Sequence, residues 1–285
     1  MAEGSAEGTA AGTAGGNEAP GGSPIGVGID VGGTGIKVGK VDLDSGRVLG
    51  ERIYVKTPSP STPDAVAETI AGVLREMEWT GPVGIALPTV IHKGVAQIAY
   101  NIDESWIGTD VEELLSRHLP DNLALTLNDA DAAGIAESYY GAAKGRKGLT
   151  LLLTLGTGIG SALLLDGRLV PNSELGHVLV RAFDESSIDE TEHLAAPSLK
   201  EKNGWTLEEW AARIDSVLRQ LEHILWPRLI VLGGGISEDS ESWFPLLTNR
   251  TEVVAATRQN DAGMIGAAAY AAADGGIIDI SSVFS

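Results

Sequence analysis

A short glycine-rich segment, DVGGTGIK (Asp30 to Lys37), directly follows the apolar run IGVGI and has residue types that can hold a phosphate group. Glycine allows backbone conformations in which several N–H groups point at one anion, while threonine adds a hydroxyl and lysine a positive charge. The segment matches neither the Walker A loop, which needs GK followed by Ser or Thr, nor the dinucleotide fingerprint G-x-G-x-x-G. Taken alone, it fits a glycine hairpin without a ligand equally well. Its candidate phosphate-binding residues are Asp30, Gly32, Gly33, Thr34, Gly35 and Lys37.

A second glycine-rich loop, LGTGIGS (Leu155 to Ser161), repeats this arrangement between two apolar runs in the other half of the chain. Two such hairpin loops, one in each half, predict two walls of a single phosphate-binding cleft. A third glycine run follows the apolar RLIVL and could approach the base and ribose of a nucleotide, or form a tight turn between a strand and a helix. The candidates in these two segments are Gly156, Thr157, Gly158 and Gly160, and Gly233, Gly234 and Gly235.

Two polar segments have the side chains that group transfer requires. Asn128 and Asp129 end the run ALTLND, and polar groups at the carboxyl ends of strands in an open α/β sheet face a ligand crevice. A carboxylate there can accept the proton of a hydroxyl that attacks phosphorus, but Asp is also a favoured helix N-cap, and Asp129 is open to that interpretation. Glu174 and His177, in ELGH, can converge on a bound polyol, and a purely structural histidine is the alternative.

These residues need strands that end at the glycine loops and helices that cover the sheets. Apolar runs bounded by turn residues predict strands in both halves, among them IGVGID, KVGKVDL, RIYVKT, VGIALP, LTLLLTLG and SALLLDG. Apolar residues at helical spacing predict helices over Thr62 to Glu78, Val111 to Leu119 and Leu207 to Leu225. Strands and helices interleave along the chain, which predicts an α/β fold.

The composition fits a folded protein and excludes several classes of function. The 285 residues are 43% hydrophobic and 21% charged, and this length is typical of about two domains. Residues 1–24 are almost entirely Gly, Ala, Ser, Thr, Glu and Pro, which predicts a disordered tail. A net charge of -19 argues against a nucleic-acid partner, and the lack of a membrane-length apolar run or a secretion signal predicts a cytoplasmic protein without a membrane partner. With no cysteine, disulfides, thiolate zinc sites and cysteine nucleophiles are excluded.

The chain resembles the ROK family of sugar kinases, within the actin-like kinase superfamily, over about Gly26 to Ala272. Five segments carry the resemblance, in this order: DVGGTGIK, LNDADAA, LGTGIGS, ELGH and GGGIS. The segments NIDESWIGT, PNSELGH and SLKEKNGW are similar to the polyphosphate glucokinases (polyphosphate-glucose phosphotransferases) of actinobacteria within that family. The resemblance implies transfer of the terminal phosphoryl group of inorganic polyphosphate to the 6-hydroxyl of glucose, with ATP open as a further donor. Alternatives are a strictly ATP-dependent hexokinase or glucomannokinase and a non-catalytic, sugar-sensing regulator.

The resemblance also implies a fold and roles for the candidate residues. It implies two actin-like (ribonuclease H-like) α/β domains around a cleft, at residues 25–127 and 128–285, with a last helix at about 261–273 that packs back on the first domain. Asp129 matches the base that deprotonates the 6-hydroxyl, Asp30 would orient hydrated Mg²⁺, and the glycine loops would grip the donor phosphates. A homodimer is expected. The positions that match sugar ligands are Asn128, Asp129, Glu174, His177 and Glu192.

Some features depart from the family pattern or lie outside its motifs. Typical members follow ExGH with a cysteine-rich zinc segment, whereas this chain has RAFDESSIDETEH, so we expect no zinc site and a His177 that is free for the sugar. Thr89 stands where the family usually has glycine, which leaves the geometry of that loop open. A group of cationic residues could contact a long phosphate chain or simply lie on a solvated surface: Lys200, Lys202, Arg146 and Lys147.

Overall fold

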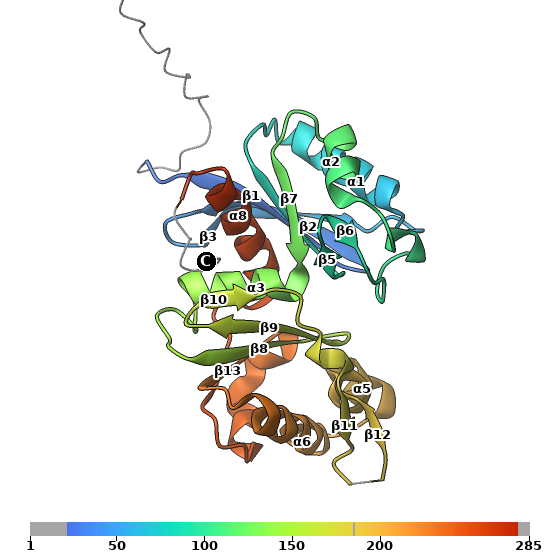
Figure 1. The fold of residues 1–285 in the computed structure, drawn as a ribbon, viewed down its shortest axis with the longest axis vertical. Coiled ribbons are helices and arrows are strands. Elements are labelled where there is room, and N and C mark those ends of the chain that lie inside the picture. Colours follow the sequence, from blue (N-terminus) through green and yellow to red (C-terminus); the bar gives the residue numbers. More distant parts are fainter. Residues whose placement is uncertain (1–21, 185, 279–285) are drawn as a thin grey trace, which may run out of the picture.

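The computed structural model describes residues 22–184 and 186–278, which form two lobes, each built on a five-stranded sheet (Figure 1). The first sheet has the strand order β3-β2-β1-β4-β7, and the second has the order β10-β9-β8-β13-β14. The strands of the first sheet are β1 (Ile25–Val31), β2 (Gly35–Asp42), β3 (Arg47–Lys56), β4 (Val83–Leu87) and β7 (Ala124–Asn128). Those of the second are β8 (Leu149–Leu155), β9 (Ile159–Leu165), β10 (Arg168–Val170), β13 (Leu229–Gly233) and β14 (Val253–Ala255). Two short hairpins complete the set: β5 (Ile91–His92) with β6 (Val95–Ala96), and β11 (Leu179–Arg181) with β12 (Ile188–Glu190).

Both large sheets follow one scheme, and that scheme decides where the two glycine loops lie. In the first sheet β1 and β2 form an antiparallel hairpin, and β4 and β7 continue the sheet as parallel strands beside β1. In the second sheet β8 and β9 form the hairpin, and β13 and β14 continue it in parallel beside β8. The two predicted glycine segments are the turns of these hairpins, at residues 32–34 and 156–158. The mixed α/β class expected from the sequence is thereby confirmed.

Helices cover both faces of each sheet. They are α1 (Pro63–Glu76), α2 (Val111–His118), α3 (Asp129–Tyr140), α4 (Thr191–Ala195), α5 (Pro197–Asn203), α6 (Leu207–Leu225), α7 (Ser240–Trp243) and α8 (Ala262–Asp274). Helices α1 and α2 share one core with β1 and β4, while α6 shares another with β8 and β13. Helices α3 and α8 lie between the two sheets, where α3 contacts β9 and α8 contacts β1 and β4 (Figure 1).

Glycines let α3 and α8 pack closely against each other and against the first sheet. A Cβ atom at Gly266 of α8 would lie 1.7 Å from the carbonyl oxygen of Ala132 in α3. On β1, a Cβ atom at Gly28 would lie 1.8 Å from the carbonyl oxygen of Met264. Such distances are far inside van der Waals contact, so these positions admit only glycine without a shift of backbone. The close packing joins the two lobes through their central helices.

The lengths of the predicted helices agree with those observed. Helix α6 spans Leu207–Leu225 as predicted, and it begins with a capping box in which Thr206 and Glu209 satisfy each other's backbone N–H groups. Helix α1 begins one residue later than predicted, because the Thr62 side chain caps it and Pro63 is its first residue, and it ends at Glu76, two residues earlier than predicted. The predicted last helix at about 261–273 corresponds to α8, which contacts the first sheet. The boundary proposed between residues 127 and 128 lies at the end of β7 and stays a prediction.

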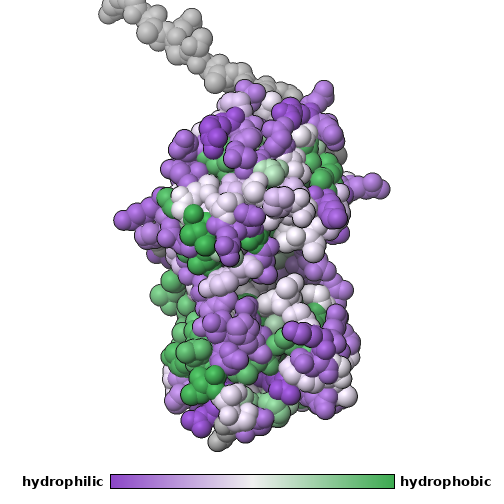
Figure 2. Space-filling view, turned by 90° about the vertical axis from the view of Figure 1, so that its right-hand side faces the viewer, coloured by the Kyte–Doolittle hydropathy of each residue, from purple (hydrophilic) through white to green (hydrophobic). Residues whose placement is uncertain are grey.

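The remaining sequence expectations concern the ends of the chain and its surface. The sequence predicts a disordered tail at residues 1–24. Residues 1–21 of that tail lie outside the described residues. Figure 2 shows a face that is mostly hydrophilic, with hydrophobic residues gathered mainly along one edge of its lower half. Within residues 22–184 and 186–278, no helix combines the length and the hydropathy that crossing a membrane requires.

Candidate active site

Both glycine turns and Asp129 line one open cavity of about 520 Å³ between the two lobes. The first turn contributes from the first sheet and the second from the second sheet, which brings together residues more than a hundred positions apart in the chain. The predicted residues on this cavity are Gly32, Gly33, Thr34, Asn128, Asp129, Gly156, Thr157, Gly158, Gly160, Glu174, His177, Glu192, Gly234 and Gly235. The spatial arrangement predicted from the sequence, two walls of one cleft with a carboxylate between them, is therefore present.

A smaller adjoining cavity of about 160 Å³ holds most of the other predicted residues. It is lined by Asp30, Lys37 and Gly233, and Asp129 lines both cavities. Gly35 lines neither one, because it starts β2 beneath Tyr54, where a Cβ atom would lie 2.1 Å from the phenol oxygen. Gly35 thus serves the packing of the hairpin rather than the surface of the cleft.

Asn128 and Asp129 divide the two roles that the sequence left open for Asp129. Asn128 is the N-cap of α3, and its Oδ1 accepts hydrogen bonds from the backbone N–H groups of Ala130 (2.9 Å) and Asp131 (3.1 Å). Asp129 is the first residue of the helix, so the reading of Asp129 as the cap is wrong. Its carboxylate accepts one bond, from Ala130 N–H at 2.8 Å, and otherwise faces the two cavities.

The surroundings of Asp129 raise its proton affinity, so that its protonated and ionised forms are about equally populated near pH 7. Burial, together with the negative charges of Asp30 and Glu174, raises the pKa of Asp129 to about 7, although the Ala130 N–H bond opposes the shift. Burial also raises the pKa of Glu174. A carboxyl group whose pKa is close to neutral and which lies in a cleft has the proton affinity of a general base.

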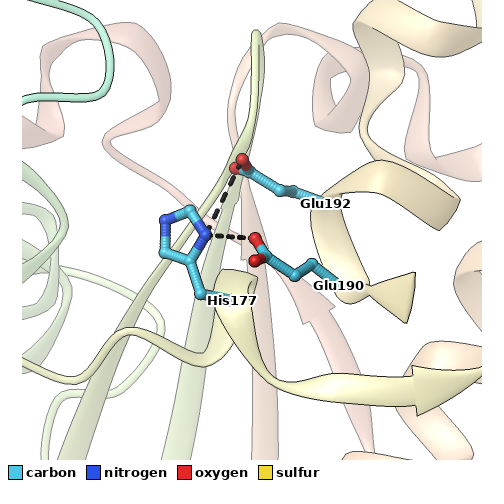
Figure 3. Close-up of side chains that lie close together, drawn as sticks. All are labelled: His177, Glu190 and Glu192. Carbon is cyan, nitrogen blue, oxygen red and sulfur yellow. Dashed lines mark hydrogen bonds and ion pairs between the residues drawn. The ribbon is translucent and has the colours of Figure 1, made fainter. Parts of the chain in front are cut away.

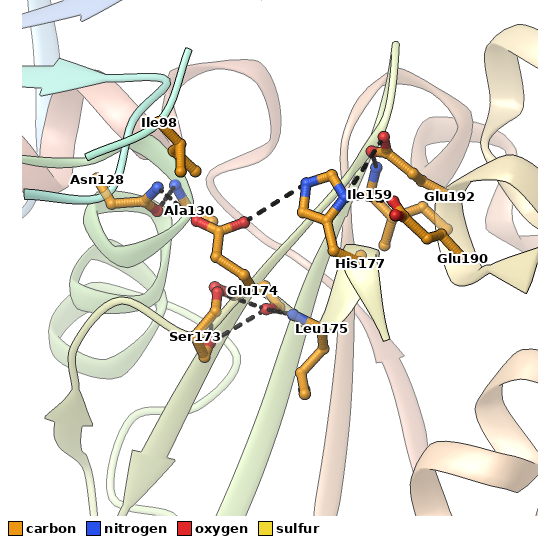
Figure 4. A network of polar contacts seen from close by, with 12 residues as sticks. Ile98, Asn128, Ala130, Ile159, Ser173, Glu174, Leu175, His177, Glu190 and Glu192 are labelled. Carbon is orange, nitrogen blue, oxygen red and sulfur yellow. Dashed lines mark hydrogen bonds and ion pairs between the residues drawn. The ribbon is translucent and has the colours of Figure 1, made fainter. Parts of the chain in front are cut away.

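His177 lines the same cavity as Asp129 and makes contacts from several directions (Figure 4). It ends a short 3₁₀ helix, Leu175–His177, that needs glycine at its centre because a Cβ atom on Gly176 would lie 2.0 Å from the carbonyl oxygen of Ile159. Its Nδ1 is 2.6 Å from Glu190 Oε2, and its Nε2 is 4.0 Å from Glu174 Oε2. His177 is thus only partly free, since Glu190 occupies one of its two nitrogens.

Sequence reasoning missed Glu190 and Tyr100, which both touch His177. The ring of Tyr100 lies against the imidazole with a centroid distance of 4.1 Å. Neither residue belongs to a recognised motif, and they come from opposite lobes, so the sequence carried no signal for Tyr100. Glu190 is two positions from the predicted Glu192, and that nearness in the sequence was the one available hint.

Glu192 ties this cluster to the second glycine turn. Its Oε2 accepts a hydrogen bond from the backbone N–H of Ile159 at 3.3 Å. A Cβ atom at Gly158 would lie 2.3 Å from that same oxygen, so glycine is required for the carboxylate to approach. The loosely matched position Glu192 therefore lies on the cavity, directly beside the turn.

Two groups of side chains have the donor atoms for a metal ion. The Asp30 carboxylate faces the smaller cavity and pairs with Lys37 Nζ at 3.2 Å, and its oxygen donors suit Mg²⁺. One ligand atom each of His177, Glu190 and Glu192 lie within 4.8 Å of one another (Figure 3). The close Nδ1 to Oε2 contact between His177 and Glu190 accounts for that grouping without a metal.

The cationic candidates lie in different places. Lys200 and Lys202 are on α5, whose Ser198 hydroxyl donates to the Thr157 carbonyl at 2.6 Å, so this helix adjoins the second glycine turn. Arg146 pairs instead with Glu252, and Lys147 lines neither of the two cavities.

Thr89, where the family usually has glycine, is fully buried beneath the cleft. Its hydroxyl donates to the Ile98 carbonyl at 2.6 Å, and its own carbonyl accepts from Asn128 Nδ2 at 3.3 Å. The threonine thereby braces the loop that supports Asn128.

Comparison with known proteins gives this site a family context. The chain is 50% identical to the polyphosphate glucokinase of Mycobacterium tuberculosis (strain CDC 1551 / Oshkosh) over 249 residues, which cover 87% of this chain and 92% of that protein. The crystal structure of inorganic polyphosphate/ATP-glucomannokinase from Arthrobacter sp. strain KM is similar, with 43% identity and a TM-score of 0.81 over 88% of this chain and 99% of that one.

More distant structures share the fold. A ROK family glucokinase from Streptomyces griseus, solved with glucose and AMPPNP, is 23% identical with a TM-score of 0.71 over 87% of this chain and 99% of that one. The model of the ROK family itself matches residues 26–193. With more than half of its length matched by that model, and with relatives of high identity along nearly all of their own length, this chain belongs to the ROK family.

Proposed function

We propose that this protein is a glucokinase that transfers the terminal phosphoryl group of inorganic polyphosphate to the 6-hydroxyl of glucose, and that ATP also serves as a donor. The observation that carries the proposal is the single cavity lined by both glycine turns and by Asp129. Kinase chemistry needs a donor phosphate and an acceptor hydroxyl held in line, and this cavity places the turns for the donor phosphates next to the carboxylate for the acceptor hydroxyl. The similarity to polyphosphate glucokinases supports the choice of donor and acceptor.

Asp129 is the general base of the proposed reaction. Its ionised carboxylate accepts the proton of the 6-hydroxyl as the oxygen attacks the terminal phosphorus, and the bond to the departing phosphate chain breaks. The pKa of about 7 leaves a substantial ionised fraction at neutral pH and a good proton affinity in the same group. Asn128 holds the first turn of α3 in place, so the position of Asp129 is fixed before glucose arrives.

The sugar lies between the two lobes in this proposal. Asn128, Glu174, His177 and Glu192 line the cavity around Asp129, and their donor and acceptor atoms can bind the hydroxyls of a hexose. Asn128 Nδ2 and Glu174 Oε1 are 3.4 Å apart, so these two residues already form a continuous polar edge.

The donor phosphates lie along the two hairpin turns. Backbone N–H groups of glycine turns can bind phosphate oxygens, and Lys37 adds a positive charge next to Asp30. When Mg²⁺ is bound, it neutralises charge on the transferring phosphoryl group. Asp30 would hold the ion, together with the donor phosphates, because its carboxylate lines the cavity next to Asp129.

The test is formation of glucose 6-phosphate from nucleotide-free polyphosphate, compared with ATP, using purified protein treated to remove bound nucleotide. The proposal expects product with polyphosphate in the absence of any nucleotide. Product with ATP alone would favour the strictly ATP-dependent alternative, and no product with either donor would reject a kinase function. Mannose, tested in parallel, measures the sugar selectivity.

We also propose that the protein is a homodimer, as the family resemblance implies, and that it is cytoplasmic, as expected from the sequence. Light scattering of the purified full chain at several concentrations measures the assembly, and a mass equal to one chain at all of them would contradict the dimer.

A further inference from the structure

His177 is held in the cleft by a close polar contact on one edge of its ring and by an aromatic ring on one face. Its Nδ1 lies 2.6 Å from Glu190 Oε2 (Figure 3). Both side chains are largely shielded from solvent, with 18% of His177 and 32% of Glu190 exposed. We propose that Glu190 is a positioning residue, which holds His177 in one tautomer and one orientation so that its Nε2 accepts a hydrogen bond from a sugar hydroxyl. The inference rests on the proposed function and assigns a part in it to a residue outside the sugar-binding motifs.

The identity of the two atoms decides the tautomer. A neutral imidazole donates from one nitrogen and accepts at the other, while an ionised carboxylate only accepts. Nδ1 must therefore carry the hydrogen that points at Glu190, and this charge-assisted bond is of the short, strong kind. In the neutral ring, Nε2 is then left with a free lone pair.

That lone pair lies at the edge of the main cavity. Nε2 is 4.0 Å from Glu174 Oε2, and His177 and Glu174 both line the cavity beside Asp129 (Figure 4). A sugar hydroxyl placed there can donate to Nε2. With the other tautomer, Nε2 would donate instead, and the hydroxyl would have to accept.

The backbone around Glu190 fixes its distance from His177. β11 starts two residues after His177 and pairs with β12 so that Glu190 is opposite Leu179. Thr191, the next residue, donates from its backbone N–H to the Val178 carbonyl at 3.0 Å. Its buried hydroxyl also lies 2.6 Å from the Leu175 carbonyl. The loop that carries His177 and the strand end that carries Glu190 are thereby joined at several points.

Other groups restrict the remaining freedom of the ring. Tyr100 covers one face at a centroid distance of 4.1 Å, which limits rotation of the imidazole. Among the described residues, the carboxylates that face His177 are Glu174, Glu190 and Glu192, the last with Oε1 3.8 Å from Nδ1. Of the three carboxylates, Glu190 makes the closest contact with Nδ1, and Glu192 is already engaged with Ile159 N–H.

Three variants of the full chain test the assignment. Glu190→Ala removes the acceptor and is expected to raise the KM for glucose about tenfold, which corresponds to about 1.4 kcal/mol, with a smaller change in kcat. Glu190→Gln keeps an oxygen that can accept from Nδ1, so its KM should stay within about threefold of the unaltered protein. Glu241→Ala is the matched control, because Glu241 is an exposed carboxylate on α7 of the same lobe and lines neither of the two cavities. It should leave KM unchanged.

Nitrogen-15 NMR of labelled histidine reads the tautomer directly and does not depend on activity. The inference expects the hydrogen of His177 on Nδ1 in the unaltered protein and in Glu190→Gln, and a loss of this preference in Glu190→Ala. A hydrogen on Nε2 in the unaltered protein would overturn the inference, as would a stoichiometric divalent metal bound by His177, Glu190 and Glu192.

The outcomes separate this inference from the proposed function. If Glu190→Ala matches the unaltered protein in KM and tautomer while glucose 6-phosphate is still formed, the assignment of Glu190 is wrong and the glucokinase stands. If no glucose 6-phosphate forms with any donor, the proposed function fails. Calorimetric titration with glucose then decides whether Glu190 positions His177 for a sugar: binding that weakens in Glu190→Ala supports it, and unchanged binding or none overturns it.

Discussion

Asp129 must be ionised before it can accept a proton from glucose, so the reaction should slow as the pH falls. With a pKa of about 7, roughly a tenth of this carboxyl is ionised at pH 6 and roughly nine tenths at pH 8. The kcat/KM for glucose is therefore expected to rise about tenfold between these two values. A carboxyl with the ordinary aspartate pKa of 3.8 would be ionised at both, and the rate would not change.

A charge-removing variant identifies the group that titrates. The negative charge of Asp30 helps to raise the pKa of Asp129, so Asp30→Asn should lower that pKa and move the acid limb of the profile to lower pH. Titration of the donor phosphates would give a limb at the same pH in both proteins. Because Asp30 is also proposed to hold Mg²⁺, the variant will be slower overall, and the position of the limb is the quantity to compare.

The assay measures glucose 6-phosphate at saturating polyphosphate and varied glucose, from pH 5.5 to 9, at constant ionic strength and free Mg²⁺. A flat profile above pH 5 would refute the assignment of the raised pKa to the catalytic base. A limb near pH 7 that stays in place in Asp30→Asn would refute the electrostatic reasoning.

Three further predictions concern stability. Burial raises the pKa of Asp131 to about 7, so the folded state binds this proton more tightly than the unfolded chain does. The folded state therefore loses up to about 4 kcal/mol of stability as the pH rises from about 4 to 7. In urea unfolding, Asp131→Asn should be more stable than the unaltered protein by a larger margin at pH 8 than at pH 5. Gly266→Ala should lower the free energy of unfolding by about 1–3 kcal/mol through overpacking of α3 against α8, whereas Gly72→Ala, where a Cβ atom meets nothing within 4 Å, should raise it by about 0.5–1 kcal/mol. Thr89→Ala should cost about 1–3 kcal/mol in the same measurement, because the Ile98 carbonyl loses a buried donor.

The hairpins and the long helix were predictable because their signals are local. Glycine turns between apolar runs mark the ends of strands, and the apolar stripe of α6 runs from Trp210 to Leu221 with a capping box before it. Repetition of the glycine hairpin in both halves was the one long-range clue, and both turns do line a single cavity, while phosphate binding by them stays a prediction.

The parts that the sequence did not predict depend on contacts between distant residues. Asp and Asn are both favoured N-caps, so the order of Asn128 and Asp129 at the helix start could only be decided from the geometry of the bonds to Ala130. The stacking of Tyr100 on His177 joins the two lobes, and no periodicity encodes it. The family resemblance predicted a free His177 from the missing cysteines, but it did not supply the replacement partner, Glu190.

The most direct test of the central claim is the turnover of Asp129→Asn with nucleotide-free polyphosphate and glucose. Asp131→Asn is the matched control, because Asp131 is on the same helix but lines neither cavity. We expect Asp129→Asn to lose about 10²–10⁴-fold in kcat with an unchanged fold by circular dichroism, while Asp131→Asn stays within a few fold of the unaltered protein. Turnover of a folded Asp129→Asn close to that of the unaltered protein would contradict the account.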